Sequence, residues 1–184
     1  MFDYIVKDVM EVVGYLPIGI LCGILAVAIY LVCVWHAGRK RHLDGSSEMD
    51  DNDVLAVTSV GTHIWNSMVW FLLGVYLAVM FVTVFLSREP GSRQGIDMIL
   101  FGTWGETPQA HAFVIENILL FVPFGILYPL AVSATDRKPD LRKKIGWEKF
   151  TVLWGFLISV GIETVQLITE RGYCQLDDVV MNTL

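Results

Sequence analysis

The chain has 184 residues, of which 54% are hydrophobic and 17% are charged, and its formal net charge is -6. A soluble domain carries about 25% charged residues, so this composition excludes a disordered chain and argues against a water-soluble globule. It predicts a protein embedded in a membrane, and no basic tract indicates a nucleic-acid partner. Since one span with its loop takes roughly 25–45 residues, the length allows about four or five spans.

The N-terminal segment leads into the first predicted span, at residues 17–35. Residues 1–11 are acidic rather than basic, so we expect the apolar segment behind them to be a retained anchor and not a signal peptide. Cys22 and Cys33 lie within this segment about 16 Å apart along a helix, which is too far for a bond. Together with Cys174 they form neither a disulfide framework nor a zinc-binding pattern.

The second predicted span covers residues 65–86 and ends a long run without acidic or basic residues. Residues 54–64 are more polar, so we expect them to form an interfacial lead-in. His63 and Asn66 lie near the junction, three residues apart, and we expect interfacial hydrogen bonds from them.

The following segment, residues 87–112, is neither a span nor a plain linker. Its apolar residues, Trp104 among them, alternate with glycines and polar residues. This pattern suits a re-entrant or interfacial segment, in which protein or water must satisfy the backbone. It equally suits a partly ordered surface loop, and both interpretations stay open.

Two more spans are predicted at residues 117–132 and 150–169. Pro123 lies inside the first of them and removes a helical hydrogen bond, so it predicts a kink that either is benign or opens room beside Asn117. Another helix begins near residue 179 and is cut off at the end of the chain. The predicted fold is therefore an all-α polytopic transmembrane helical bundle, a single membrane domain over residues 1–184 with four spans and the start of a fifth.

The distribution of basic residues predicts the orientation of these spans. An outside N-terminus places nine Lys and Arg residues in cytoplasmic segments and four outside. We therefore predict that the N-terminus lies outside the cell membrane and that loops 39–53 and 133–149 are cytoplasmic. The acidic part of the first loop is compatible with this, because Asp and Glu contribute little to orientation.

Polar side chains at the outer ends of the last helices need an explanation. Glu163 lies within the fourth span, where an ionisable group costs roughly 2.5–3.5 kcal/mol and needs a partner or a watery cavity. Gln166 shares its helix face at i+3. An interhelical hydrogen bond is the plain interpretation of this pair, although a neutral Gln alone could form one.

The other polar residues are expected at the same height. We predict an outward-facing cluster and propose Arg171 as the ion-pair partner of Glu163 or of an aspartate. Asp178 and Asn182 share a helix face, and Asp177 is placed to cap the fifth helix. The candidate functional residues are Asn117, Glu163, Gln166, Arg171, Asp177, Asp178 and Asn182. Glu116 and His111 are expected nearby, and no metal-ligand spacing or cofactor motif is present.

In this order, these residues resemble the VanZ-like family of bacterial membrane proteins. The matching stretches are residues 117–125, which include Asn117 and Pro123, residues 163–166, and then Arg171, Asp177, Asp178, Asn182 and Thr183. The resemblance covers residues 75–184. It implies a small helical bundle of about five spans in the bacterial envelope, linked through the founding member to teicoplanin resistance. Family members continue through a final helix, of which this sequence holds only six residues, and the sequence leaves open whether the chain is truncated after residue 184.

Three functions agree with this pattern. The first is binding of a lipid-linked or amphiphilic molecule, such as a cell-wall precursor or a lipoglycopeptide, beside membrane lipids. The second is an intramembrane enzyme acting on a lipid head group, in which Glu163 or Asp178 would be the general base or a metal ligand and Arg171 would bind a phosphate. The third is a small transporter, which the absence of an internal repeat disfavours. The sequence leaves the ligand and the oligomeric state undetermined.

Overall fold

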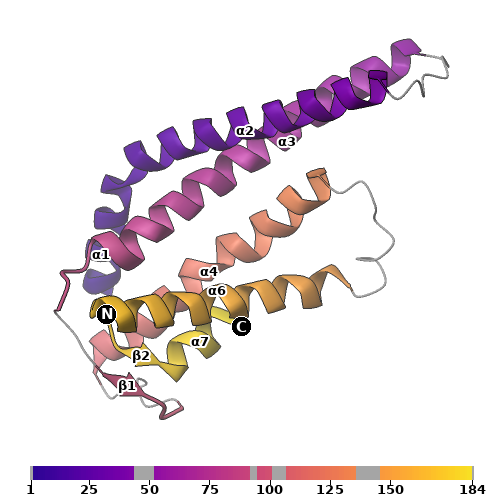
Figure 1. Ribbon diagram of the computed structural model, residues 1–184. Helices are drawn as coiled ribbons and strands as arrows, with labels where there is room; N and C mark the ends of the chain where they lie inside the picture. Colours follow the sequence, from indigo (N-terminus) through magenta and orange to yellow (C-terminus); the bar gives the residue numbers. More distant parts are fainter. Residues whose placement is uncertain (1, 44–51, 92–94, 101–106, 136–145, 184) are drawn as a thin grey trace.

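The computed structural model describes residues 2–43, 52–91, 95–100, 107–135 and 146–183. These residues form a helical bundle with two very short strands (Figure 1). Its elements are α1 (Phe2–Gly14), α2 (Leu16–Leu43), α3 (Asn52–Phe81), the π-helix η1 (Val82–Leu86), β1 (Ile96–Asp97), α4 (Pro108–Thr135), α6 (Trp147–Thr169), β2 (Cys174–Gln175) and α7 (Leu176–Thr183).

Four helices in the described part of the chain are long and apolar enough to cross a membrane. They contain the candidate spans Leu16–His36, Val60–Leu86, Val114–Ser133 and Glu148–Thr169. Each overlaps one predicted span, so the prediction of an all-α membrane bundle is confirmed. The polar lead-in at residues 54–64 is a continuous part of α3, whose apolar span begins at Val60.

The chain changes direction between α1 and α2, at Gly14 and Tyr15. Gly14 has low helix propensity, and Pro17 has no amide hydrogen for a preceding carbonyl. Consequently α1 is turned sharply from α2 and lies across one end of the bundle (Figure 1).

Small residues bring α2 and α3 close together along their lengths. A Cβ added at Gly23 would lie 2.7 Å from Val75 Cγ2, and one added at Gly74 would lie 2.8 Å from the Cβ of Ala26. Such distances leave no space for a side chain, so the glycines allow the two backbones to approach. Between spans in lipid, close van der Waals contact of this kind is a main source of helix association.

The core lies between α3, α4 and α6. One cluster joins Met80 and Val84 to Phe121, Phe124 and Ile162, and a second joins residues of α3 to Ala131. α4 continues through Pro123 and Pro129, and the hydroxyl of Tyr76 donates to the carbonyl of Leu120 at 2.8 Å. This carbonyl is next to the one that Pro123 leaves without its helical donor. The bond therefore ties α3 to α4 beside the proline.

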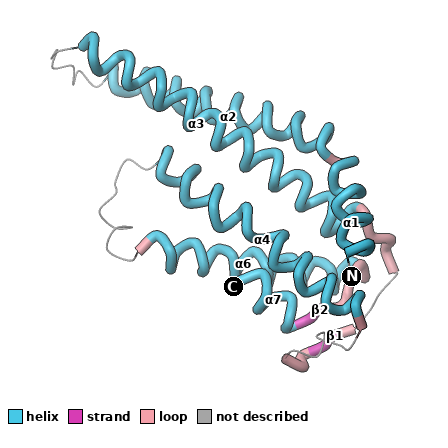
Figure 2. Tube along the Cα trace, turned by 180° about the vertical axis from the view of Figure 1, so that it is seen from behind, coloured by secondary structure: helices cyan, strands magenta, loops and turns pink. Residues whose placement is uncertain are grey.

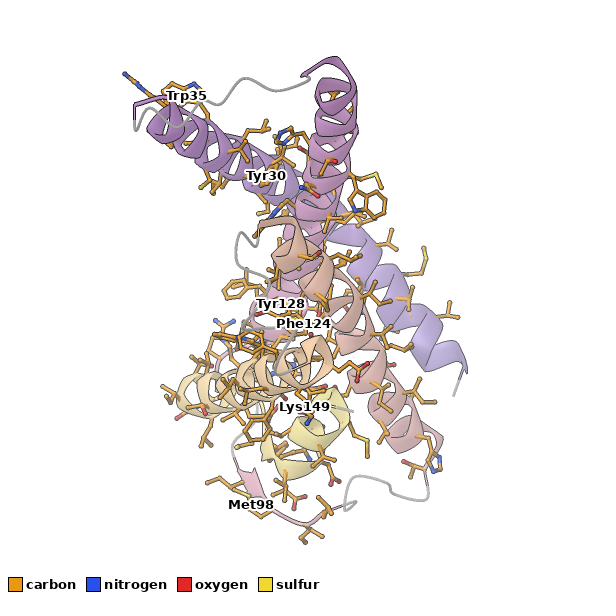
Figure 3. The ribbon with its side chains drawn as sticks, turned by 90° about the vertical axis from the view of Figure 1, so that its right-hand side faces the viewer. Tyr30, Trp35, Met98, Phe124, Tyr128 and Lys149 are labelled. Carbon is orange, nitrogen blue, oxygen red and sulfur yellow. The ribbon has the colours of Figure 1, made fainter. Side chains whose placement is uncertain are left out.

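At the end of α2 opposite to α1, Arg39 lies over the ring of Trp35, with its guanidinium carbon 5.5 Å from the ring centroid. Figure 3 labels Trp35 at this far end of the molecule. An aromatic ring with a neighbouring cation is the usual anchor at a membrane interface. Nearby, the hydroxyl of Tyr30 and Nδ1 of His63 are 3.5 Å apart, which fits the expected hydrogen bonding of His63.

Two segments far apart in the sequence pair as parallel strands. Ile96 in β1 lies opposite Cys174 in β2, and the amide of Cys174 donates to the carbonyl of Gly95 at 3.0 Å. The predicted segment 87–112 is therefore attached to the residues that follow α6. Trp104, on which the re-entrant interpretation depended, lies outside the described residues.

The last helix, α7, begins at Leu176, three residues before the predicted start. It packs against α6 and α4 and runs back along α6 toward the middle of the bundle (Figures 1 and 2). Its first turn lies beside β2, so the polar residues of α7 meet α4 and α6 toward this end of the bundle.

Candidate functional site

Four segments end or begin together at one end of the bundle, which we call the site end. They are η1 with Ser87 and Arg88, the first turns of α4, the last turns of α6, and α7 with β2. Figure 2 shows these segments gathered on the side where α1 also lies. All seven candidate residues belong to three of these segments: α4, α6 with the turn behind it, and α7.

A polar stripe runs along the buried face of α6. Ser159, Glu163 and Gln166 follow one another at i, i+4 and i+7, so the stripe extends about 10 Å along the helix. Ser159 is 0% exposed, and Glu163 and Gln166 are each 3% exposed. The predicted shared face of Glu163 and Gln166 is therefore turned into the bundle and away from lipid.

Glu163 contacts the segment that leads into α7. Its Oε2 accepts a hydrogen bond from the amide of Gln175 at 3.0 Å. The charges of Arg88 and Asp178 act on the same carboxylate. A carboxylate enclosed in this way stabilises the turn between α6 and α7.

Two hydrogen bonds join α7 to its neighbours. Asn117 Nδ2 donates to Asp178 Oδ1 at 2.6 Å, and Asn182 Nδ2 donates to Ser159 Oγ at 3.0 Å. The other polar atom of Asn182, Oδ1, is buried and accepts no hydrogen bond in the described residues. A buried acceptor without a donor costs about 1–3 kcal/mol, so Oδ1 of Asn182 is a hydrogen-bond acceptor that the described residues leave unused.

Asp178 lies outside the four spans, and its surroundings oppose ionisation. Burial raises the pKa of its carboxyl to about 6, and the charge of Asp177 acts in the same direction. The charge of Arg88 and the hydrogen bond from Asn117 lower the pKa but do not offset the burial. Asp178 therefore changes its charge near neutral pH. Burial, with the charges of Glu163 and Asp178, also raises the pKa of the Cys174 thiol.

Gln166 and Arg171 contact the backbone of the segment around η1. Gln166 Nε2 donates to the carbonyl of Val84 at 3.3 Å, and Arg171 Nη1 donates to the carbonyls of Phe85 and Arg88. In the part of the chain that the structure describes, Nη1 of Arg171 is directed at these backbone oxygens. The predicted ion pair of Arg171 with Glu163 or an aspartate stays a prediction. A π-helix offers such carbonyls because its wider turn displaces them from the regular helical pattern. Gln166 and Arg171 thus fasten the end of α6 to η1.

Arg88 is the cation beside the carboxylates. Its charge acts on both Glu163 and Asp178. Gly172 allows this arrangement, because a Cβ there would lie 2.9 Å from Gln166 Oε1 and 3.0 Å from Arg88 Nη1.

The remaining predicted residues lie near the cluster in different ways. Asp177 is 2% exposed and lies within the first turn of α7, not at the capping position before it. There its charge still interacts favourably with the helix N-terminus. Glu116 is half-buried, whereas His111 is exposed in the first turn of α4.

The sequence reasoning missed Ser159 and Arg88. Ser159 could have been found, because it precedes Glu163 by one helical turn on the same face. Arg88 carried no such signal, since its place depends on η1 and on the turn after α6. Within the described ranges, no three His, Cys, Asp or Glu residues are grouped so that they could hold a metal ion.

The fold and the site together define the class of protein. The chain is a polytopic helical membrane protein with a buried polar cluster at one end of its spans.

Comparison with known families agrees with this class. The model of the VanZ/LLP1 family matches residues 66–184. The match covers well over half of the chain, and the protein therefore belongs to the VanZ-like family. It includes all seven candidate residues and Arg88, whereas α1 and α2 lie before it. Searches of curated proteins and of solved structures found no significant match.

Proposed function

We propose that this VanZ-like protein binds the polar head of a lipid-linked or amphiphilic molecule at the site end. The observation that carries the proposal is the buried cluster of Glu163, Asp178 and Asn182. A bundle that only anchors itself in lipid has no need of two carboxylates and an unused amide oxygen, because each is costly in a membrane. A ligand would donate hydrogen bonds to these oxygens and so offset the cost of burying them.

The chemistry of the cluster favours a ligand rich in hydrogen-bond donors. Its inward-facing atoms include the carboxylate oxygens of Glu163 and Asp178 and the free Oδ1 of Asn182. Hydroxyl, amide and ammonium groups satisfy such acceptors. Lipoglycopeptides and lipid-linked cell-wall precursors present these groups next to an apolar chain. Arg88 would contact an anionic group such as a phosphate.

We place this activity in the bacterial cell envelope. The excess of basic residues in loops 39–53 and 133–149 supports an outside N-terminus, and the site end would then face outward. Capture of a lipoglycopeptide or of its precursor target at this face would alter susceptibility to teicoplanin-type antibiotics, as the family resemblance implies.

Titration of the purified protein in lipid nanodiscs tests the proposal. Teicoplanin and a lipid-linked disaccharide precursor are titrated separately against the wild type, Glu163→Gln and Asp178→Asn. Glu170→Gln is the matched control, because Glu170 is exposed at the end of α6, seven residues beyond Glu163. At least one ligand should bind the wild type and the control equally and bind the two cluster variants more weakly. Equal binding by all four proteins would show that the cluster is not the site.

A second candidate is an intramembrane enzyme that acts on a lipid head group. The observation in its favour is that the pKa of Asp178 is raised to about 6, which is suitable for a general base near neutral pH. The same nanodisc samples distinguish the two functions. Release of a product that depends on Asp178 would favour the enzyme, and binding without product would favour the binding protein.

A further inference from the structure

Two elements at the site end expose large apolar side chains although neither belongs to a span. The first is α1, where Val6, Val9, Met10 and Val13 follow one another at helical spacing and form one stripe. They are 47–65% exposed. Lys7 lies off this stripe and is also exposed. A short helix with an exposed apolar face and a charged face is typical of a helix in a membrane interface.

The second element is the segment that follows Gly95. Ile96, Met98, Ile99 and Leu100 are 48–69% exposed. Figure 3 shows Met98 projecting at the edge of the molecule. Asp97 of the same segment is half-buried, and its Oδ1 accepts a hydrogen bond from the amide of Ile99 at 3.0 Å. The polar side chain therefore holds the turn while the apolar ones face outward.

The backbone of this segment is held in place by residues 173–175. β1 pairs with β2, and Gly95 faces the ring of Tyr173, since a Cβ at Gly95 would lie 2.7 Å from Tyr173 Cδ1. The exposed apolar side chains are therefore presented by an ordered turn. A patch of this kind in water would favour aggregation, so it indicates contact with a membrane or a partner.

Continuity with the lipid-facing surface identifies the occupant. α1 joins the first candidate span directly, and Leu16 at the start of that span is exposed. Ile168, in the last turn of the fourth span, is 74% exposed and precedes Tyr173 by only five residues. Both elements thus adjoin the surfaces that lipid covers.

We propose that α1 and the segment 96–100 are embedded in the interface of the bilayer leaflet at the site end. The stripe of α1 and the apolar turn face the acyl chains, while the charged side of α1 faces water. Because α1 packs against α4 and β2 leads into α7, this contact sets the depth of the cluster around Asp178. An amphiphile would then reach the cluster sideways from the leaflet. The contact with lipid itself does not depend on the proposed ligand.

Spin-label accessibility tests this inference. Met10→Cys and Met98→Cys are made separately in the full chain after its three native cysteines are replaced by serine, and each is labelled and reconstituted in phosphatidylcholine nanodiscs. Lys7→Cys and Glu89→Cys are the controls on exposed polar positions. Collisions with oxygen report lipid, and collisions with a nickel chelate report water. Val13→Cys and Ile99→Cys serve as a second pair if either methionine variant fails to elute as a monodisperse protein.

The labels on the apolar positions should show a ratio of oxygen to nickel accessibility several-fold above that of the controls. An equal ratio at apolar and control positions would place these elements in water and overturn the proposal. Low accessibility to both reagents with spin–spin broadening would instead indicate a second copy of the chain, and would also overturn it. No ligand takes part, so a failure here leaves the binding proposal intact, and a failure of ligand binding leaves this one intact.

Discussion

Replacement of Asp178 by Asn is expected to stabilise the protein near neutral pH. Burial raises the pKa of the Asp178 carboxyl from 3.8 to about 6, so its ionised form is disfavoured in the folded state. Asn has nearly the same shape, carries no charge, and offers an oxygen to Asn117 where the carboxylate now accepts a 2.6 Å hydrogen bond. The variant therefore removes the cost of a buried charge and keeps the contact.

The magnitude follows from the difference between the two pKa values. They differ by about 2 units, and each unit corresponds to about 1.36 kcal/mol, so the full effect is about 3 kcal/mol. Because the folded state has the higher pKa, it binds protons more tightly than the unfolded state. The contribution of Asp178 to stability is greatest below pH 3.8 and is lost as the pH rises through about 6. The Asn variant should therefore become more stable than the wild type as the pH rises from 3.8 through about 6.

Thermal unfolding in detergent, followed by tryptophan fluorescence at several pH values, measures this difference. At about pH 7.5 the Asn variant should melt ~6–12 °C above the wild type, and near pH 4 the two should nearly coincide. The control is Glu170→Gln at an exposed position, whose difference in melting temperature from the wild type should be the same at all of these pH values. A gap for Asp178→Asn that is independent of pH, or a variant less stable than the wild type at about pH 7.5, would refute the reasoning.

Three further predictions concern packing, the fastening of α6, and orientation. Gly23→Leu should lower the melting temperature, because overpacking costs about 1–3 kcal/mol. Gly161→Leu is the control and should not lower it, because nothing lies within 4 Å of a Cβ added there. Equal effects of the two substitutions would contradict the close contact of α2 with α3. Arg171→Met should destabilise the folded state by about 1.5–3 kcal/mol, because it leaves two carbonyls beside η1 without their charged donor, whereas an unchanged unfolding curve would contradict that role. In intact cells, Cys174 should react with a thiol reagent that cannot cross the membrane, and reaction only from the cytoplasmic side would reverse the predicted orientation.

Sequence patterns predicted the spans well because the physics behind them is local. About 20 apolar residues are needed to cross the hydrocarbon, and the four predicted spans each overlap a helix of that kind. The face shared by Glu163 and Gln166 was also predictable, because helical spacing alone determines it. The convergence of Asn117 with Asp178 followed from the expected height of each residue in the membrane.

The partners of the polar groups were not predictable in the same way. Arg171 was expected to pair with a carboxylate, but its guanidinium donates hydrogen bonds to backbone carbonyls of η1 and Arg88. The spacing of residues in the sequence does not predict a π-helix. Arg88 reaches Glu163 and Asp178 only because the chain turns at Gly172 and because β1 pairs with β2. These are long-range contacts between segments about eighty residues apart. Local patterns in a single sequence do not predict such contacts.

The charge of Asp178 is predicted to destabilise the fold near neutral pH, because burial raises the pKa of its carboxyl to about 6. A residue whose charge destabilises the fold near neutral pH is expected where function requires it. If Asp178→Asn stabilises the protein and abolishes binding, the two results together identify Asp178 as a functional residue. Stabilisation without any loss of binding would leave its carboxylate without a role.

A ligand bound at the cluster should shield the residues around it from a reagent in solution. Cys174 is a suitable native reporter, because the charges of Glu163 and Asp178 act on its thiol. Its rate of reaction with a small maleimide is measured in nanodiscs at alkaline pH, with and without saturating teicoplanin or lipid-linked precursor. One of these ligands should slow the reaction severalfold in the wild type and in Glu170→Gln but not in Glu163→Gln. Unchanged rates with both ligands present, or equal slowing in Glu163→Gln, would contradict the claim that the buried cluster is the binding site.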